Sequence, residues 1–391
     1  MEHRVRRQLD RMVDELRAKG CIRSEHVADA FGSVPRHLFL PGVPTTRAYT
    51  AEKAIPTHFD ENGIPVSSSS APNIMAVMLE QLSVEPGQRV LEIGTGTGYN
   101  AALLSHLVGD TGTVVSLDID AEVAREAEVH LDAAKVGAVE VRVGDGWLGA
   151  TDKGKFDRIM ATVEAWDIAP QWYDQLETGG ILVLPLWLRP GLTVAVAFEK
   201  VPTGLVSRSM AYCGFMPLRG PHASGPLRAT LTTWPNQRTR APASGRVVAV
   251  LDEATPERVD ALQRLLQHPA TVTSRPALFA GWNLRLTLEE PDPICFFEVG
   301  EEPRNSIGLL DSRAASLALV DGASILSFGG DSCRQRIIAS LERSRPLALE
   351  SLVITALPQP VLRSGDADAV LHRPNFDFAL RGLSTTHRGG A

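Results

Sequence analysis

The chain has 391 residues, of which 44% are hydrophobic and 22% are charged, so it can bury the cores of about two domains. A formal net charge of −7 argues against the broad basic surface that non-specific nucleic-acid binding needs. The four cysteines and ten histidines are scattered, without the spacing of a disulfide framework or of metal ligands. The polar N-terminus and the lack of any run of ~20 apolar residues predict a reduced, cytoplasmic protein that binds neither membrane nor metal.

The first 65 residues predict two helices and an extended connection. Apolar residues at helical spacing predict a helix over residues 4–18, and Ser24 is expected to cap a second helix. Two prolines bracket residues 34–41, which are expected to be extended, while residues 42–65 show no clear period. The 34–41 segment suits either pairing with an extended peptide or a packed connection under a sheet.

A run of serines precedes the next predicted helix. Proline fits the first turn of a helix because its missing N–H costs nothing there, so Pro72 marks the helix start. Ser69 or Ser70 is therefore the expected N-cap.

Strands and helices then alternate regularly. Strands are predicted at 89–93, 114–118, 139–143, 157–162 and 180–185, and helices at 99–108, 121–134 and 169–177. This alternation predicts an α/β fold, a Rossmann-like, mostly parallel and doubly wound sheet with helices on both faces. Apolar runs at 192–198 and 206–215 have no helix between them and predict an antiparallel pair at its edge.

The composition changes near residue 219. Residues 219–245 are rich in glycine, proline and arginine and are expected to form a linker or an arm crossing the first domain. A second unit follows, with strands expected at 246–251, 277–286, 292–298, 315–320 and 350–355, and helices at 255–267 and 331–343. We therefore expect one domain over 1–218, with N-terminal helices and an acceptor arm over 1–80 and a cofactor-binding core over 81–218. A C-terminal α+β domain over 246–383 and a disordered tail over 384–391 complete the prediction.

Residues 90–100 read Val-Leu-Glu-Ile-Gly-Thr-Gly-Thr-Gly-Tyr-Asn. An apolar strand followed by closely spaced glycines and a helix start is typical of a backbone turn that passes close to a ligand. The turn alone is a weak signal, because sites for NAD, FAD and S-adenosylmethionine share it.

Acidic residues at three strand ends favour S-adenosylmethionine. Glu92 could face the cationic methionine end of that cofactor, Asp118 could receive ribose hydroxyls, and Asp145 could accept the adenine amine. Each could instead be a solvated acid, but their order along the sheet favours a shared ligand. The alternative is an NAD-linked or non-catalytic nucleotide binder. Glu92 counts against NAD, because a carboxylate close to the turn would disfavour a pyrophosphate. The expected cofactor residues are Glu92, Gly94, Thr95, Gly96, Thr97, Gly98, Asn100, Asp118, Ile119, Asp145 and Gly146.

Several motifs resemble protein-L-isoaspartate O-methyltransferases. They lie at residues 34–41, 69–72, 91–99, 144–146 and 175–185, and the resemblance covers about residues 1–215. It implies an S-adenosylmethionine-dependent enzyme that methylates a carboxylate of a protein or peptide and releases S-adenosylhomocysteine. By analogy with the family's serine, Ser70 is expected to steer the attacking oxygen, with Ser68 as a second candidate, whereas a plain helix cap is the alternative for Ser70.

Other features look like an actinobacterial branch of that family, the FxLD-system methyltransferases. They are residues 66–72, 165–167 and 206–215 and the long C-terminal extension. This resemblance implies methylation of an aspartate in a modified ribosomal peptide, often a lanthipeptide, which proceeds through aspartimide to isoaspartate. The C-terminal domain would then recognise the peptide. Repair of isoaspartate in damaged proteins is the alternative with the same chemistry.

The chain departs from the repair enzymes at two positions. Ser68-Ser69-Ser70 replaces their usual Thr-Ile-Ser, and Glu164 stands where they carry a small residue beside the cofactor. A carboxylate there would repel a substrate carboxylate unless it is turned away or neutralised.

The roles of four other residues stay open. Tyr49 and His58 lie in the segment expected to cover the acceptor site, although both suit an ordinary surface position. Trp166 suits either the core or a wall of the cofactor site, and Cys213 suits a buried apolar position.

Overall fold

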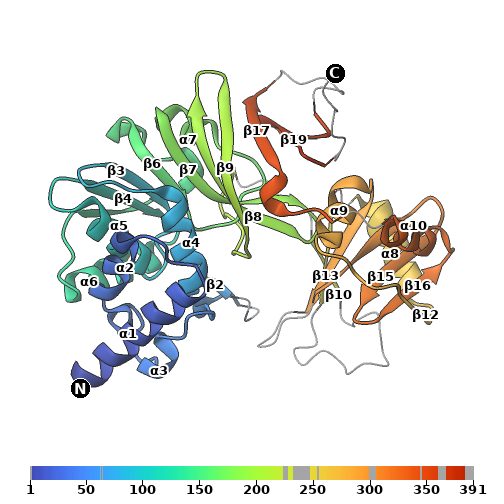
Figure 1. Ribbon diagram of the computed structural model, residues 1–391, viewed down its shortest axis with the longest axis horizontal. Coiled ribbons are helices and arrows are strands. Elements are labelled where there is room, and N and C mark those ends of the chain that lie inside the picture. The colour runs from blue at the N-terminus through green and yellow to red at the C-terminus, as the bar shows by residue number, and fades with distance from the viewer. Residues whose placement is uncertain are drawn as a thin grey trace.

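Two sheets organise the molecule, one of ten strands and one of seven, beside a separate two-stranded hairpin (Figure 1). The computed structural model describes residues 2–61, 63, 65–222, 228–231, 247–252, 255–298, 305–343, 346–359 and 367–383. We call the part built on the larger sheet the first lobe, and the described residues between 228 and 343 the second lobe. The expected tail over 384–391 and most of the expected linker lie outside the described residues.

One half of the larger sheet has the predicted parallel arrangement. Its strand order is β18-β19-β17-β9-β8-β7-β6-β3-β4-β5, with β3 to β7 parallel and β8 and β9 antiparallel. The strands are β3 (Arg89–Ile93), β4 (Thr113–Asp118), β5 (Val139–Val143), β6 (Phe156–Ala161), β7 (Leu176–Arg189), β8 (Leu192–Val201) and β9 (Gly204–Tyr212). The predicted Rossmann-like α/β fold is therefore confirmed, although antiparallel strands make up the other half of the sheet.

Helices cover both faces of this sheet because alternate strand residues face opposite sides. They are α4 (Pro72–Leu82), α5 (Tyr99–Val108), α6 (Ala121–Ala133) and α7 (Pro170–Gln175). Val90 joins the core that holds α4 and α5, whereas Leu91 joins the opposite core, which holds Trp172 of α7.

The N-terminal region adds helices and a hairpin to one face. Helix α1 (Glu2–Ala18) and helix α2 (Glu25–Ser33) have the predicted positions, and the Ser24 side chain accepts a hydrogen bond from the Val27 N–H as the expected cap. The expected extended structure over residues 34–41 is wrong, because Arg36–Phe39 form a 3-10 turn, η1, that buries Arg36 and Phe39 three residues apart.

The 42–65 segment contains structure that its sequence pattern does not predict. Helix α3 (Thr45–Ala48) is followed by β1 (Ile55–Phe59) and β2 (Pro65–Ser69), which pair with each other in antiparallel register. The pairing shifts around His58, so the alternation that marks a regular strand is lost.

The second lobe is a fully antiparallel sheet with helices. Its order is β10-β11-β13-β14-β15-β16-β12. The elements are β10 (Arg228–Leu231), β11 (Val247–Leu251), α8 (Pro256–Leu266), β12 (Thr271–Ser274), α9 (Trp282–Glu289), β13 (Pro293–Glu298), β14 (Asn305–Asp311), β15 (Ser316–Asp321), β16 (Ser324–Gly329) and α10 (Ser332–Glu342).

The expected strand at 277–286 is wrong, since most of it belongs to α9. Trp282 and Leu286 pack in one core of the second lobe, while Leu284 and Leu288 pack in the core shared with the first lobe. A helix that is buried on two opposite sides carries apolar residues at every second position, and this pattern is also typical of a strand.

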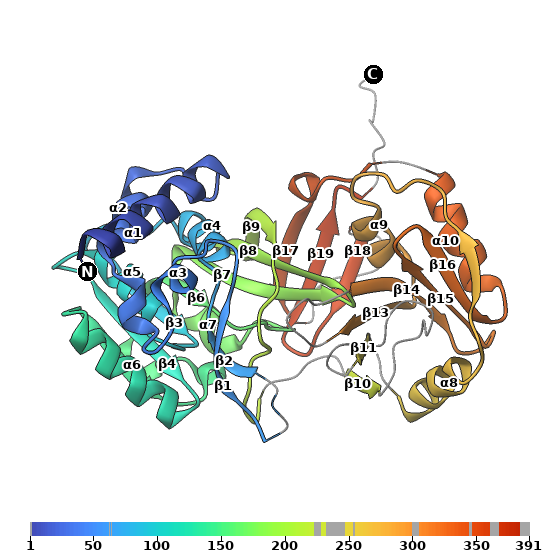
Figure 2. The ribbon, with the colours of Figure 1, turned by 90° about the horizontal axis from the view of Figure 1, so that it is seen from below.

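The chain returns to the first lobe after α10. Strands β17 (Val353–Pro358), β18 (Ala369–His372) and β19 (Phe376–Arg381) extend the larger sheet, and Figure 2 shows them beside β9. The sequence predicts a strand at 350–355 as part of the second unit. This membership is wrong, because β17 pairs with β9 of the larger sheet. The Ile354 N–H donates to Ser207 Oγ at 2.8 Å, which fixes this junction. The predicted antiparallel pairing of β8 with β9 is therefore confirmed, but their expected position at the edge of the sheet is wrong, because β17, β19 and β18 follow β9.

None of the helices in the described ranges combines the length and hydropathy that a membrane crossing requires. The same residues contain no group of three or more His, Cys, Asp or Glu side chains placed to hold a metal ion.

Candidate active site

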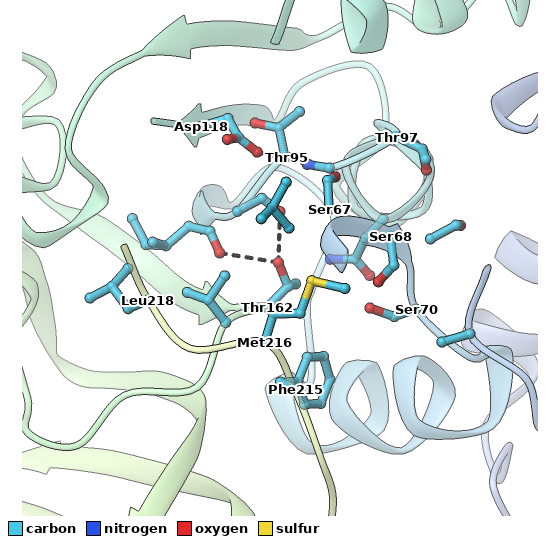
Figure 3. A pocket seen from close by; sticks show the side chains of 18 of the residues that line it. Ser67, Ser68, Ser70, Thr95, Thr97, Asp118, Thr162, Phe215, Met216 and Leu218 are labelled. Carbon is cyan, nitrogen blue, oxygen red and sulfur yellow. Dashed lines mark hydrogen bonds between the residues drawn. The ribbon is translucent and has the colours of Figure 1, made fainter. Parts of the chain in front are cut away.

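A cavity of about 700 Å³ lies at the carboxyl ends of β3 and β4. Doubly wound sheets bind ligands at this edge, and the volume suits a small-molecule site. The glycine turn after β3, strand β2, the start of α4 and residues 214–219 bound the cavity, and Phe297 reaches it from the second lobe. Figure 3 shows Asp118 toward one end of the cavity and Ser70 and Phe215 toward the other.

The glycine turn is shaped by close backbone approaches. Gly94, Gly96 and Gly98 have φ angles of +98°, +53° and +84°. A Cβ on Gly94 would lie 2.6 Å from Thr162 Oγ1, and a Cβ on Gly96 would lie 3.1 Å from the Ser68 carbonyl oxygen. Thr162 Oγ1 donates to the Gly94 carbonyl at 2.6 Å, one of the bonds dashed in Figure 3. The turn therefore forms a tight cradle that only glycine can build.

Glu92 lies behind the cavity wall and orients Asn100. The buried Glu92 carboxylate accepts from Asn100 Nδ2 at 2.7 Å and from Ser116 Oγ at 2.5 Å. Burial raises the pKa of Glu92 to about 7, against the lowering effect of these two hydrogen bonds. Because Nδ2 is held by Glu92, Asn100 Oδ1 is left buried and without a partner in the described structure, and Asn100 lines the cavity. This oxygen can accept a hydrogen bond from a cationic amine.

Acidic groups at the ends of β4 and β5 bind backbone N–H groups. Asp118 Oδ2 accepts from the Gly96 N–H at 3.0 Å, and burial raises the pKa of Asp118. Asp145 does not line the cavity; its carboxylate lies 2.9 Å from His222 Nδ1 and caps the turn before Trp147. His222 therefore pairs with the Asp145 carboxylate, which the sequence suggested as the acceptor for an adenine amine.

Most of the predicted cofactor residues meet at this cavity. Gly94, Thr95, Gly96, Thr97, Asn100, Asp118, Ile119 and Gly146 line it, whereas Glu92, Gly98 and Asp145 do not. The unpartnered Asn100 Oδ1 suits the amine of S-adenosylmethionine, and the acid at the end of β4 suits its ribose. The glycine cradle lets such a ligand lie close to the backbone.

The serine run lines the same cavity as the glycine turn. Ser68 and Ser70 both line the cavity. The expected serine cap is wrong, because Ala71 occupies the N-cap of α4 and no side chain caps this helix. The residue before a proline prefers extended backbone, and Ala71 adopts it immediately before Pro72. The Ser70 hydroxyl is therefore not used for capping.

Glu164 does not contribute to the cavity wall. Its Oε2 accepts from Thr193 Oγ1 at 2.7 Å, and its carboxylate helps burial to raise the pKa of Cys213. The Glu164 backbone pairs with the segment after β9, donating to the Met216 carbonyl at 2.7 Å and accepting from the Leu218 N–H at 2.8 Å. The carboxylate is thus turned away, which removes the expected repulsion of a substrate carboxylate.

The remaining candidates lie outside the cavity wall. Trp166 packs against Arg373, whose guanidinium carbon lies 4.5 Å from the ring centre. Tyr49 is buried rather than on the surface, with its hydroxyl 2.8 Å from His37 Nδ1, and His58 pairs with Glu126 at 3.3 Å.

Three residues at or near the site have no sequence signal of their own. Thr162 and Phe297 line the cavity, and Arg36 is buried behind the serine run. Thr162 and Phe297 lie near strand ends, and only the assembled sheets bring these ends to the cavity. Arg36 lies in a segment that the sequence predicts to be extended.

The family model of protein-L-isoaspartate(D-aspartate) O-methyltransferases matches residues 7–222. The chain belongs to this family. It is 34% identical over 210 residues to a protein-L-isoaspartate O-methyltransferase of Ignicoccus hospitalis, covering 53% of this chain and 95% of that protein. It is 36% identical over 218 residues to protein-L-isoaspartate O-methyltransferase 1 of Archaeoglobus fulgidus, covering 56% of this chain and 94% of that protein. The protein is therefore an S-adenosylmethionine-dependent protein carboxyl O-methyltransferase, and the NAD-linked alternative is wrong.

A solved structure of a protein-L-isoaspartate O-methyltransferase shares the fold with a TM-score of 0.51 and 21% identity. The alignment covers 88% of this chain and 95% of that one, so it extends well beyond the family-matched region. A long C-terminal extension therefore does not by itself separate the FxLD-system branch from other members of the family.

Proposed function

We propose that this enzyme works in the cytoplasm and methylates the free carboxylate of isoaspartyl residues in proteins or peptides. One observation carries the proposal: the serine run and the glycine turn line a single cavity and contact each other at Ser68 and Gly96. Ser68 and Ser70 thereby lie beside a donor site built from Gly94, Gly96 and Asn100. The serine run and the glycine turn both fall within the family-matched region.

The donor supplies a methyl group on a positively charged sulfur. On this proposal Asn100 Oδ1 accepts from its amine, Asp118 binds its ribose hydroxyls, and Ile119 and Gly146 line the space for its adenine. Glu92 acts through Asn100 by holding the amide with its oxygen toward the cavity.

The acceptor needs little acid–base help, because a carboxylate is already ionised at neutral pH. The protein must align the carboxylate oxygen with the methyl carbon and sulfur, and such alignment can supply ~7–11 kcal/mol. Ser70 would steer the oxygen with its uncommitted hydroxyl. Val66, Phe215 and Met216 provide an apolar lining that excludes water from the reacting groups.

A labelled-methyl assay tests the proposal. The protein would be incubated with S-adenosylmethionine and either an isoaspartyl peptide or a matched peptide containing ordinary aspartate. Base-labile label on the isoaspartyl peptide alone is the expected result. Label on neither peptide, in protein that binds S-adenosylhomocysteine by calorimetry, would refute it.

A second candidate is methylation of an aspartate in a modified ribosomal peptide, as in the FxLD-system branch. The observations that favour it are the Ser68-Ser69-Ser70 run and the contribution of Phe297 to the cavity. The methyl ester would be attacked by the following backbone amide, giving aspartimide and then isoaspartate by hydrolysis. A macrocyclic aspartyl peptide of lanthipeptide type, added to the assay above, distinguishes the two candidates by which peptide is labelled.

The motif at residues 165–167 has a structural role that does not depend on either substrate. Asp167 accepts from the Asn375 N–H at 2.7 Å and from Asn375 Nδ2 at 2.8 Å, and Trp166 packs on Arg373. This motif therefore joins the turn between β18 and β19 to the rest of the first lobe.

We propose that the second lobe is a peptide-recognition domain, with Phe297 as its contact at the acceptor site. Gly191, in the turn between β7 and β8, packs so closely on Cys295 and Ile307 that a Cβ there would lie 3.1–3.2 Å from them. This packing holds β13, and therefore Phe297, in place. Truncation after residue 245 would also remove β17 to β19 from the first sheet, so a point substitution is the cleaner test.

Phe297→Ser should raise the KM for the peptide while leaving S-adenosylhomocysteine affinity unchanged. Leu278→Ser, an exposed position on the same lobe, is the matched control. An unchanged peptide KM in Phe297→Ser would exclude this contact.

A further inference from the structure

Arg36 is a fully buried cation next to the serine run. Its Nε donates to the Ala48 carbonyl at 2.9 Å, and its Nη2 donates to the Ser70 carbonyl at 2.8 Å and the Ser69 carbonyl at 3.4 Å. Burial lowers the pKa of Arg36 to about 10, so the side chain stays charged at neutral pH. The positive charge therefore lies inside the protein, directly behind β2.

The contacts of Arg36 within the described structure are all to neutral groups. Besides the three carbonyls, Nη1 lies 3.9 Å from Met75 Sδ, and the guanidinium carbon lies 4.8 Å from the centre of the Tyr99 ring. No ion pair with a carboxylate is found for Arg36 among the described residues. Burying a charge is costly unless an opposite charge lies nearby, so the position calls for an anion.

The cavity is the place where that anion can bind. Ser69, Ser70, Met75 and Tyr99 all contact Arg36 and all line the cavity, so the guanidinium lies one layer behind its wall. Ser69 Oγ and Tyr99 Oη are buried and have no hydrogen-bond partner in the described structure. Two buried hydroxyl groups without a partner in the described structure thus belong to residues that line the cavity and contact the buried cation.

We propose that Arg36 is a positioning residue whose buried charge draws the acceptor carboxylate to the serine end of the cavity, where the hydroxyls of Ser69 and Tyr99 donate to it. This inference rests on the proposed function, because it requires the acceptor to be a carboxylate.

The chemistry predicts which kinetic constant Arg36 controls. A carboxylate oxygen forms a bond to the methyl carbon as the bond from that carbon to sulfur breaks, and the electron pair of that bond stays on sulfur. The negative charge on the acceptor and the positive charge on the donor both disappear. A fixed cation therefore stabilises the bound carboxylate more than the transition state, and it contributes to KM rather than to kcat.

Two substitutions separate charge from hydrogen bonding. Arg36→Gln keeps an N–H donor near the Ser70 carbonyl but removes the charge, whereas Arg36→Lys keeps the charge and loses the planar fork. Arg158→Gln is the matched control, because Arg158 is half-buried, donates to the carbonyls of Leu82 and Ser83, and does not line the cavity. Acceptor KM and kcat would be measured for all three variants, with S-adenosylhomocysteine binding as the test of a folded donor site.

Arg36→Gln should raise the acceptor KM roughly tenfold or more, with kcat unchanged or increased. Arg36→Lys should keep KM within about threefold of the native value, and Arg158→Gln should alter neither constant. A fall in kcat at unchanged KM in Arg36→Gln would overturn the inference, since it would indicate a purely structural role.

Should Arg36→Gln fail to bind S-adenosylhomocysteine, the lysine variant decides. Native KM supports the role of the charge, and a raised KM with lowered kcat overturns it. An unaltered acceptor KM in an active Arg36→Gln variant would refute the positioning role of Arg36. A native enzyme that binds S-adenosylhomocysteine yet methylates no carboxylate peptide would instead refute the proposed function itself.

Discussion

Glu92 should make the stability of the protein fall as the pH rises through the neutral range. Its carboxyl group is completely buried, and its pKa is raised from 4.5 to about 7, mainly by burial. At about 1.4 kcal/mol per pKa unit, the shift corresponds to about 3 kcal/mol of unfolding free energy. Below pH 4.5 both the folded and the unfolded states hold the proton, so the stabilisation is complete there.

Between pH 4.5 and about 7 the unfolded state releases this proton while the folded state retains it, so stability declines with pH. Above pH 7 the carboxyl group is ionised in both states and the loss is complete. Glu92→Gln abolishes this titration while keeping an oxygen that can accept from Asn100 Nδ2.

Urea unfolding followed by tryptophan fluorescence at pH 5 and pH 8 measures the effect. Part of the term is already lost at pH 5, so the difference in unfolding free energy between the variant and the native protein should shift by about 2.5 kcal/mol in favour of the variant from the lower to the higher pH. All other titrating groups are common to both proteins and cancel. An equal difference at the two pH values would show that the carboxyl group titrates normally and would refute the reasoning.

Three further predictions follow from the site and from the contact between Asp167 and the C-terminal strands. Gly94→Ala should weaken S-adenosylhomocysteine binding by about tenfold or more in calorimetry, because the new Cβ would lie 2.6 Å from Thr162 Oγ1 at a φ of +98°; unchanged affinity would show that the turn is not tight. Ser70→Ala should lower kcat but change the unfolding free energy by less than about 0.5 kcal/mol, since this serine caps no helix; a loss near 1 kcal/mol in urea unfolding would restore the cap interpretation. Asp167→Ala should destabilise the protein by about 1–3 kcal/mol in urea unfolding, because it leaves the Asn375 N–H and side-chain amide without their acceptor, whereas native stability would indicate that β19 is held by its strand pairing alone.

That the glycine turn, Asp118 and Gly146 line one cavity could be predicted from local sequence, because these residues come from consecutive strand ends. In a parallel sheet the carboxyl ends of neighbouring strands lie at one edge, so the turn at Gly94, Asp118 and Gly146 converge once the strand order is known. The strand and helix positions between residues 89 and 133 follow from short-range periodicity, which the structure keeps.

The acceptor end depended on contacts between distant segments. Arg36 comes from a turn expected to be extended, and Phe297 comes from a strand more than two hundred residues beyond the serine run. The helix α9 was expected to be a strand because it is buried between two cores, which gives it the alternation of a strand. An alternating hydrophobic pattern shows that residues are buried, but it does not show whether they belong to a helix or to a strand.

By itself the sequence determined the doubly wound α/β fold, the glycine turn after β3 and the family of the protein, because these depend on local periodicity and on motifs within single strand–turn–helix units. Only the tertiary structure decided that β17 to β19 complete the first sheet, that Glu92 bonds to Asn100 from behind the cavity wall, and that the Glu164 carboxylate bonds to Thr193 outside the cavity. The physical reason is that strand pairing, burial and hydrogen-bond direction are properties of residues brought together by folding, and a single stretch of chain does not contain them.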